Sequence, residues 1–247
     1  MSGAIIRFLI SIILRIGDIA NSDKMILRIY KAYPVVQGEF SMIQEKLNAL
    51  SNRAGIKPPS LYITELHLPG SFIFGKKPNE TIMVFPKRLL DIMKPDHIEA
   101  MLAYSLVQIN DNIRIRTLVA LVTSFMTLSS SAIRWVTVFT GFGDYNDPAP
   151  KLFGLFIMGL VAPPAATMVQ SVTKPDYDGK AAAMCGSPDS LISAIEILEN
   201  NNVTGYPSLG FVCLIDPKAE TFFEQLFQTH PSRDVRMKNL FAKGEKT

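Results

Sequence analysis

Two long apolar stretches limit what this chain can fold into more than any other feature of its sequence. Residues 117–138 are apolar apart from hydroxyl side chains and one arginine, and residues 152–169 are interrupted mainly by two consecutive prolines. A membrane helix tolerates both hydroxyls and prolines, whereas internal prolines break an ordinary soluble helix. Neither stretch has about twenty uninterrupted apolar residues. The pattern predicts a helical hairpin at about residues 117–172 that dips into or crosses a bilayer, with a pair of buried soluble helices as the alternative.

The charges around this hairpin indicate which side of the membrane the rest of the chain occupies. The loop between the two stretches, residues 141–148, is rich in turn-forming residues and carries two aspartates. Positively charged flanks of membrane helices stay in the cytoplasm. Four basic residues flank the hairpin on the side of the folded domain: Arg114, Arg116, Lys174 and Lys180. We therefore expect a protein of the cell (plasma) membrane whose folded domain lies on the cytoplasmic side.

The N-terminal segment, residues 1–20, carries a second membrane signal. Its large apolar residues share one helical face, and polar or charged residues occupy much of the other face. The apolar face consists of Ile5, Ile6, Leu9, Ile12, Ile13 and Ile16. A segment so short and charged fits a helix that lies in the membrane surface or against a partner, not one that spans the bilayer. The chain then divides into this amphipathic helix and a folded domain, residues 21–247, interrupted by the hairpin.

The other residues mix short strand patterns with amphipathic helices, which predicts an α+β domain. Residues 81–85 have the pattern of a strand, Pro86 is placed to open a helix, and residues 187–189 have the composition of a helix cap. A second strand-like run covers residues 209–215, and two short helices are expected around His230. The domain is therefore expected to be mostly helical, with a small sheet.

Composition narrows the classes of function. The chain has 247 residues and a net charge of +3, which is too small to indicate nucleic-acid binding. The two cysteines, Cys185 and Cys213, have no metal-finger or C-x-x-C spacing, so we expect ordinary thiols in a reducing compartment. The three histidines are widely separated: His67, His97 and His230. The sequence therefore contains no local metal-binding motif.

Several sequence blocks follow one another in the order of a known protein family. They are the helix and turn that end in residues 54–63, the segment 69–75, the run 96–103 that leads into a helix, the apolar residues 160–163, and residues 229–232. Over roughly residues 33–242 the chain resembles the HtpX-type membrane zinc metallopeptidases. The resemblance implies a gluzincin-like metallopeptidase domain in which residues 69–75 form an edge strand that holds substrate.

The resemblance also identifies residues 100–117 as the metal-binding helix, but without its chemistry. In the motif His-Glu-x-x-His, two histidines on one helix face bind zinc and the glutamate activates water. Tyr104, Ser105 and Gln108 stand at these three positions. A phenol with a pKa of about 10 and an amide oxygen are poor zinc ligands, and a serine cannot take a proton from water at neutral pH. Zinc-dependent hydrolysis is therefore not expected.

The third zinc ligand of the family is replaced as well. The family's Glu-x-x-x-Asp motif supplies this ligand after the last membrane span, and the register from Gly186 puts its glutamate at Lys174 and its aspartate at Asp178. Lysine binds zinc only when deprotonated, which its reference pKa of about 10.4 opposes. Asp178 is retained, but in the family it is not a direct ligand. We therefore expect no bound metal and no cofactor.

These observations predict a catalytically inactive HtpX-like protein that serves as a structural or binding subunit of a membrane complex. Its expected partners are membrane lipid and other membrane protein subunits. Two alternatives stay open: a membrane-associated peptidase with an atypical site, for example Ser105 with a distant base, and a peptide-binding sensor that uses the edge strand. The predicted binding cleft consists of Ser71, Phe72, Ile73, Phe74, Tyr104, Gln108, Asp178 and His230.

Overall fold

The structure is a computed structural model that describes most of the chain before the predicted hairpin and part of the chain after it. The described residues are 22–36, 38–109, 113, 117, 176–201, 213–216 and 230–244. The predicted surface helix at residues 1–20 and the hairpin at residues 117–172, except Thr117, lie outside these ranges. Within the described ranges, no helix combines the length and the apolar character that crossing a membrane requires.

A small mixed sheet forms the centre of the α+β fold. Its strands are β1 (Tyr33–Pro34), β2 (Ser60–Thr64), β3 (Phe72–Lys77) and β4 (Glu80–Pro86). Their order in the sheet is β1-β2-β4-β3, with β2 and β4 parallel and the other pairs antiparallel. The edge position of β3 agrees with the edge strand that the resemblance implies for residues 69–75.

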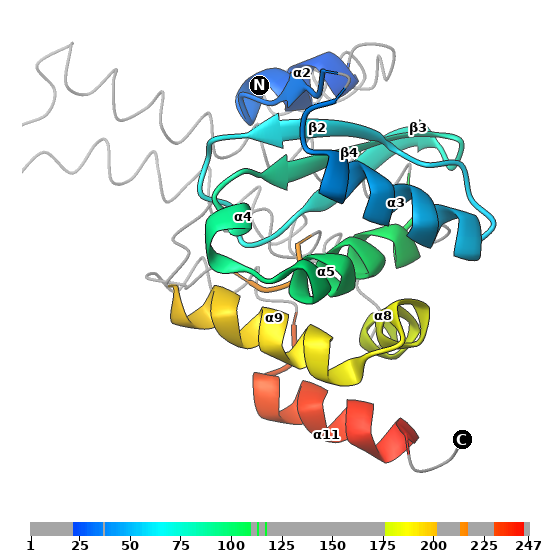
Figure 1. Cartoon of the computed structure of the whole chain (residues 1–247), viewed down its shortest axis with the longest axis vertical. Helices are drawn as coiled ribbons and strands as arrows, with labels where there is room; N and C mark the ends of the chain where they lie inside the picture. The colour runs from blue at the N-terminus through cyan, green and yellow to red at the C-terminus, as the bar shows by residue number, and fades with distance from the viewer. Residues whose placement is uncertain are drawn as a thin grey trace, which may run out of the picture.

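Helices cover both faces of this sheet (Figure 1). Helix α2 (Ser22–Ile29) packs on one face, where Ile26 and Tyr30 are buried against Phe72 and Phe74 of β3. The other face is covered by α3 (Ser41–Arg53) and α5 (Pro95–Val107). A further layer of helices packs beneath α5: α8 (Tyr177–Cys185), α9 (Pro188–Asn200) and α11 (Arg233–Gly244), while the short α4 (Leu89–Ile92) connects β4 to α5.

Helix α5 lies at the centre of the domain, and beyond its first turn it has no exposed polar face. Its residues from Ala100 to Val107 are all buried, and it packs against the sheet on one side and against α8 and α9 on the other. A helix buried on all sides belongs in the interior of a domain. The residues at the expected zinc positions are therefore interior residues, placed between the sheet and the outer helices.

Local signals explain where several helices begin. Pro95 occupies the first turn of α5, where its missing N–H breaks no helical hydrogen bond. Ser187 caps α9 as predicted: its hydroxyl accepts a hydrogen bond from the Ser190 N–H at 3.2 Å. The cap satisfies one of the amide groups that a helix leaves unpaired at its N-terminus.

One prediction about local structure is wrong, and a second is wrong in the part that the structure describes. Pro86 is the last residue of β4 and does not open a helix, because it pairs with Thr64 at the strand end, where a missing N–H costs little. In the run 209–215, the described residues 213–215 form bends and no strand; the run's other residues lie outside the described ranges. Helix α11 follows Pro231, as one of the two expected short helices, and residues 217–229 are outside the described part.

Candidate functional site

Tyr104 and Ser105 of α5 lie at the expected positions of the first zinc ligand and of the catalytic glutamate, and they face different neighbours. Successive residues in an α-helix point about 100° apart. Tyr104 therefore faces α8 and the C-terminal segment, whereas Ser105 faces the sheet. Both side chains are buried, with exposed fractions of 3% and 0%. The helix thus separates two clusters of polar groups, which we call the tyrosine cluster and the hydroxyl cluster.

A chain of hydrogen bonds forms the centre of the tyrosine cluster. The Tyr104 hydroxyl lies 2.9 Å from Nε2 of His230, and Nδ1 of the same ring lies 3.0 Å from an oxygen of Asp216. The His230 backbone N–H donates to the other carboxylate oxygen at 2.7 Å. Because a carboxylate only accepts hydrogen bonds, Nδ1 carries the ring proton, and Nε2 accepts the proton of the Tyr104 hydroxyl. The chain runs from Tyr104 through His230 to Asp216.

A buried ion pair completes this cluster. Arg236 of α11 makes two hydrogen bonds to the Asp178 carboxylate of α8, one of them at 2.7 Å, and a third to the Leu214 carbonyl at 2.8 Å. Its side chain is 3% exposed, and its guanidinium carbon lies 5.7 Å from the centre of the Tyr104 ring. Burial favours the neutral form, but the hydrogen bonds and charge of Asp178, together with Tyr104 and Asp216, raise the pKa of Arg236. The guanidinium is therefore a fixed positive charge.

The hydroxyl cluster lies between α5 and the edge strand. The Ser105 hydroxyl is 2.9 Å from the Ser71 hydroxyl, 3.2 Å from the Ser71 carbonyl and 3.3 Å from the Met101 carbonyl. Further along β3, the Thr117 hydroxyl accepts from the Gly75 N–H at 2.8 Å and lies 2.9 Å from the Gly75 carbonyl. The same hydroxyl is 2.8 Å from the Ile113 carbonyl, so its single proton goes to one of the two carbonyls. Through these hydrogen bonds, Ser105 and Thr117 hold β3 and the residue before it against other segments of the same chain.

The predicted cleft residues do not all lie together. Tyr104, Asp178 and His230 meet in the tyrosine cluster, and Ile73 belongs to the core between the sheet and α5. Phe72 and Phe74 alternate with Ile73 along β3, so they pack on the opposite face, under α2.

The three other candidate residues, Ser71, Gln108 and Lys174, lie outside the tyrosine cluster or outside the described residues. Ser71 joins the hydroxyl cluster, and Gln108 is fully buried at the end of α5. Lys174 lies outside the described residues, and its assignment to the third ligand position stays a prediction.

The donors present around Tyr104 do not fit a zinc ion. The Tyr104 phenol shares its proton with His230, and a neutral phenol with a pKa of about 10 is a poor ligand. Ser105 and Gln108 offer a hydroxyl and an amide, which bind zinc weakly. A dication would also lie close to the fixed charge of Arg236, and the two would repel each other in this buried region. Among the described residues, no three Asp, Glu, His or Cys side chains gather as a metal site would require.

Two members of the tyrosine cluster were not found by sequence reasoning. Asp216 follows a run that has the pattern of a strand, and Arg236 lies in an ordinary amphipathic helix. Neither residue belongs to a recognisable motif. Their partners are distant along the chain: Arg236 is 58 residues from Asp178, and His230 is 126 residues from Tyr104. The fold alone brings these groups together.

Comparisons with known proteins agree on one family. The model of peptidase family M48 matches residues 37–243. A protease HtpX homolog of Desulfatibacillum aliphaticivorans is 28% identical, with 89% of this chain and 74% of that protein covered. Another from Syntrophobacter fumaroxidans is 26% identical, covering 96% and 89%, and a third from Sulfurihydrogenibium sp. is 27% identical, covering 96% and 86%. No solved structure matches the chain.

Proposed function

Because this chain belongs to peptidase family M48 but carries Tyr104, Ser105 and Gln108 where the family's zinc motif is expected, we propose that it is a catalytically inactive member of the family. In this proposal it serves as a structural or binding subunit of a membrane protein complex. Its relatives are named proteases, so its fold is that of a peptidase family. The proposed loss of activity concerns the few residues that would perform hydrolysis.

One observation carries this proposal: two of the three side chains at the expected positions of the zinc motif are already bound to other groups. Tyr104 is bonded to His230, with Arg236 beside its ring, and Ser105 is bonded to Ser71. A metal-activated water would need three ligands and a base within reach. The described residues provide neither, since the one histidine in the cluster already contacts a carboxylate and a phenol.

Sequence features support the membrane part of the proposal. Residues 1–20 carry an apolar helical stripe, and residues 117–172 contain two apolar stretches joined by a turn-rich loop. Together they offer apolar surface for lipid or for other membrane subunits. The basic residues that flank the hairpin favour a cytoplasmic position for the folded domain.

Metal analysis and a proteolysis assay test the loss of activity. The full-length chain, purified in a mild detergent, is expected to hold no stoichiometric zinc and to leave casein uncut, with or without a chelator. One tightly bound zinc per chain together with chelator-sensitive cleavage would contradict the proposal. A matched control restores the family residues: the variant Tyr104→His/Ser105→Glu/Gln108→His/Lys174→Glu should bind zinc more tightly than the parent, because it supplies three ligands and a base.

Gentle extraction from membranes tests the role as a subunit. The native protein should copurify with other membrane proteins, which mass spectrometry identifies. The variant Ile6→Asp/Ile13→Asp should weaken this attachment, because each charge would lie in the apolar stripe of residues 1–20. A matched control, Ser2→Asp/Ser11→Asp, adds the same charge outside that stripe. If the chain runs as a monodisperse monomer without detergent, both the membrane role and the subunit role are wrong.

A second candidate function rests on the contact between Asp216 and His230. A carboxylate bonded to a histidine is the arrangement that activates a nucleophile in metal-independent hydrolases. Against it, Nε2 of His230 contacts Tyr104 and not a serine, and Ser105 is bonded to Ser71. Peptide hydrolysis that resists chelators and disappears in His230→Ala, while Tyr104→Phe retains the fold, would favour this candidate over the inactive subunit.

A further inference from the structure

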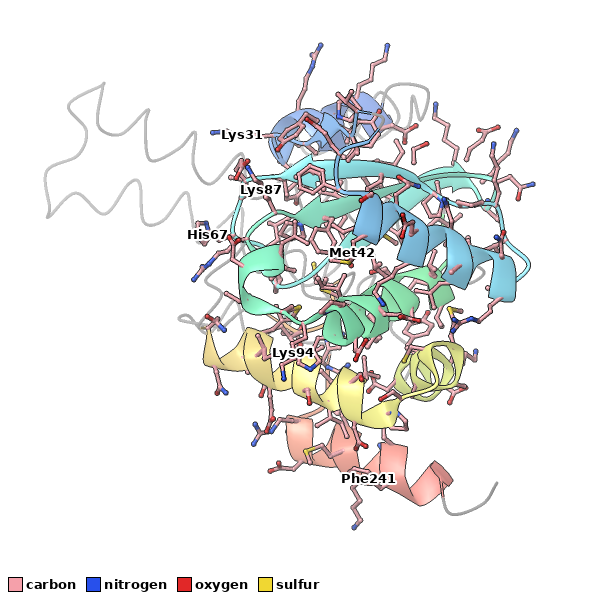
Figure 2. All side chains as sticks on the ribbon, in the orientation of Figure 1. Lys31, Met42, His67, Lys87, Lys94 and Phe241 are labelled. Carbon is pink, nitrogen blue, oxygen red and sulfur yellow. The ribbon has the colours of Figure 1, made fainter. Side chains whose placement is uncertain are left out.

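Five exposed basic residues lie on and next to α2 and just after β4, and we call this group the basic surface. Three of them, Lys24, Arg28 and Lys31, are spaced four and three residues apart on and just after α2. The spacing of Lys24 and Arg28 puts them on one face of α2, away from the buried Ile26, and Lys31 follows the end of the helix in a left-handed turn. Lys87 and Arg88, which follow β4, complete the surface. Figure 2 shows Lys31 and Lys87 on the same side of the molecule.

Two hydrogen bonds join the α2 part of this surface to the β4 part. The Thr64 hydroxyl donates to the Tyr30 carbonyl at 2.6 Å, next to Lys31. The Lys87 N–H donates to the Thr64 carbonyl at 2.9 Å. Lys31 and Lys87 therefore lie on either side of one buried residue, and the rigid sheet fixes their relative positions.

The basic surface keeps a net positive charge after its acidic neighbours are counted. The exposed carboxylates next to it are Glu65, which pairs with Lys87 at 3.0 Å, and Asp91. Asp23 of α2 is engaged with Lys76 of β3 at 3.4 Å. Five cations against two carboxylates leave a charge of +3. On α9, by contrast, two of the three acidic residues have a basic neighbour, since Arg233 of α11 pairs with Glu196 and Glu199.

Both predicted membrane segments join the described domain beside α2 and β3. Residues 1–20 end immediately before α2, whose Asp23 pairs with Lys76. The hairpin begins at Thr117, whose hydroxyl is bonded to Gly75, the neighbour of Lys76 in β3. The two segments are about a hundred residues apart in sequence, yet they reach the domain at adjacent residues of a single strand. If they enter a membrane, the N-terminal end of α2 lies close to its surface, and the helix leads from there toward Lys87 at the other end of the sheet.

We propose that the basic surface binds the anionic headgroups of membrane phospholipids. The inference rests on the membrane association put forward under the proposed function and adds the chemistry of the lipid. Lysine and arginine at a membrane surface are attracted to anionic lipids, and each contributes about fivefold to binding. The cations of α2 are exposed, whereas its apolar residues Met25, Leu27 and Ile29 are partly buried against the core, so we expect the contact to be with headgroups.

A titration with soluble-chain lipids tests the headgroup directly. The full-length chain in non-ionic detergent is titrated with fluorescent short-chain phosphatidylglycerol or with phosphatidylcholine of the same tail. The parent should prefer phosphatidylglycerol by about tenfold or more at low salt, and the preference should fade at high salt. Lys24→Gln/Arg28→Gln/Lys31→Gln should bind both lipids equally. The matched control Lys57→Gln/Lys180→Gln/Lys238→Gln removes the same charge from exposed residues elsewhere and should keep the preference.

The possible results separate this inference from the proposed function. Equal and measurable affinity of the parent for both lipids overturns the headgroup inference and leaves membrane association standing, whereas no affinity for either lipid contradicts both. An unchanged preference in the α2 variant, or an equal loss in the control, also overturns the inference. Competition by inorganic phosphate at the concentration of the lipid headgroup would indicate a free-phosphate site. Tighter binding of an RNA oligonucleotide, lost in the α2 variant, would indicate a nucleic-acid surface.

Discussion

The two polar clusters on either side of α5 are built from different kinds of interaction. On the side of α8 and α11, the tyrosine cluster combines a buried ion pair, Arg236 with Asp178, and the chain from Tyr104 to Asp216. On the side of the sheet, the hydroxyl cluster uses neutral groups only, Ser105 with Ser71 and Thr117 with Gly75. Both clusters fill the surroundings of an expected zinc site, but only the first contains charges.

Because of this difference, we expect substitutions to destabilise the protein more in the tyrosine cluster than in the hydroxyl cluster. A buried charge is costly to leave unpaired, so the members of the tyrosine cluster depend on one another. A neutral hydroxyl contributes about 1 kcal/mol and can be lost more easily. We therefore expect the tyrosine cluster to hold the outer helices in place and the hydroxyl cluster to make small, separable contributions. The following variants test this contrast.

The largest effect is expected from Asp178→Ala. It leaves the guanidinium of Arg236 buried without its carboxylate partner, which costs about 3–5 kcal/mol of the free energy of unfolding. Urea unfolding of the full-length chain in non-ionic detergent measures the change. The matched control Asp234→Ala removes an aspartate of α11 whose side chain is 89% exposed, and it should change stability by less than about 0.5 kcal/mol.

The same pair allows a second check of its mutual dependence. The double variant Asp178→Leu/Arg236→Met replaces both charges by apolar side chains and should be more stable than Asp178→Ala, because no buried charge remains unpaired. Equal stabilities of Asp178→Ala and Asp234→Ala would show that the ion pair does not hold α8 and α11 together, and the contrast between the clusters would fail.

A smaller effect is expected from His230→Ala. This variant removes the ring that links Tyr104 to Asp216 and leaves both groups without that partner, at a cost of about 2–3 kcal/mol. Tyr104→Phe keeps the ring contacts with Tyr177 and Arg236 and loses one hydrogen bond, so it should cost about 1 kcal/mol. His67→Ala, a change at an exposed histidine, serves as the control. If His230→Ala were as stable as this control, the hydrogen-bond chain would have no structural role.

Short-range patterns in the sequence predicted much of the fold, and distant contacts account for what was missed. The cap at Ser187 depends on residues a few positions apart, so the local sequence reveals it. The edge strand β3 was expected from the family resemblance. Pro86 was misassigned because the same residue type is acceptable at the first turn of a helix and at the end of a strand.

The site was predictable only where a motif has a fixed spacing. Tyr104, Ser105 and Gln108 were identified because they occupy the positions of the His-Glu-x-x-His motif, whose spacing is fixed. Asp216 and Arg236 were not, because nothing in their local sequence indicates their partners in α5 and α8. Buried ion pairs between distant segments depend on the tertiary fold, which hydrophobic periodicity does not specify.

Thr117→Val tests the hydroxyl cluster at the sheet edge. It removes the group that accepts from the Gly75 N–H, and we expect a loss of about 1 kcal/mol and faster hydrogen exchange at Gly75, by about five- to tenfold. Thr117→Ser keeps the hydroxyl and should exchange like the parent. Unchanged exchange in the valine variant would show that another group protects this amide. Stronger binding of an extended peptide by the variant would favour the peptide-binding alternative, since the edge would then be open.

The smallest effect, and the most direct comparison of the two clusters, comes from the serine pair. Ser105→Ala and Ser71→Ala each remove a neutral hydroxyl and should cost about 1 kcal/mol or less, and the double variant should show a coupling of about 0.5–1 kcal/mol. The corresponding cycle for Asp178 and Arg236 should give a coupling several times larger, because each single change there leaves a buried charge. Both cycles are measured by urea unfolding under the same conditions. Similar coupling energies would mean that charge does not distinguish the two clusters, and that α5 is held equally from both sides.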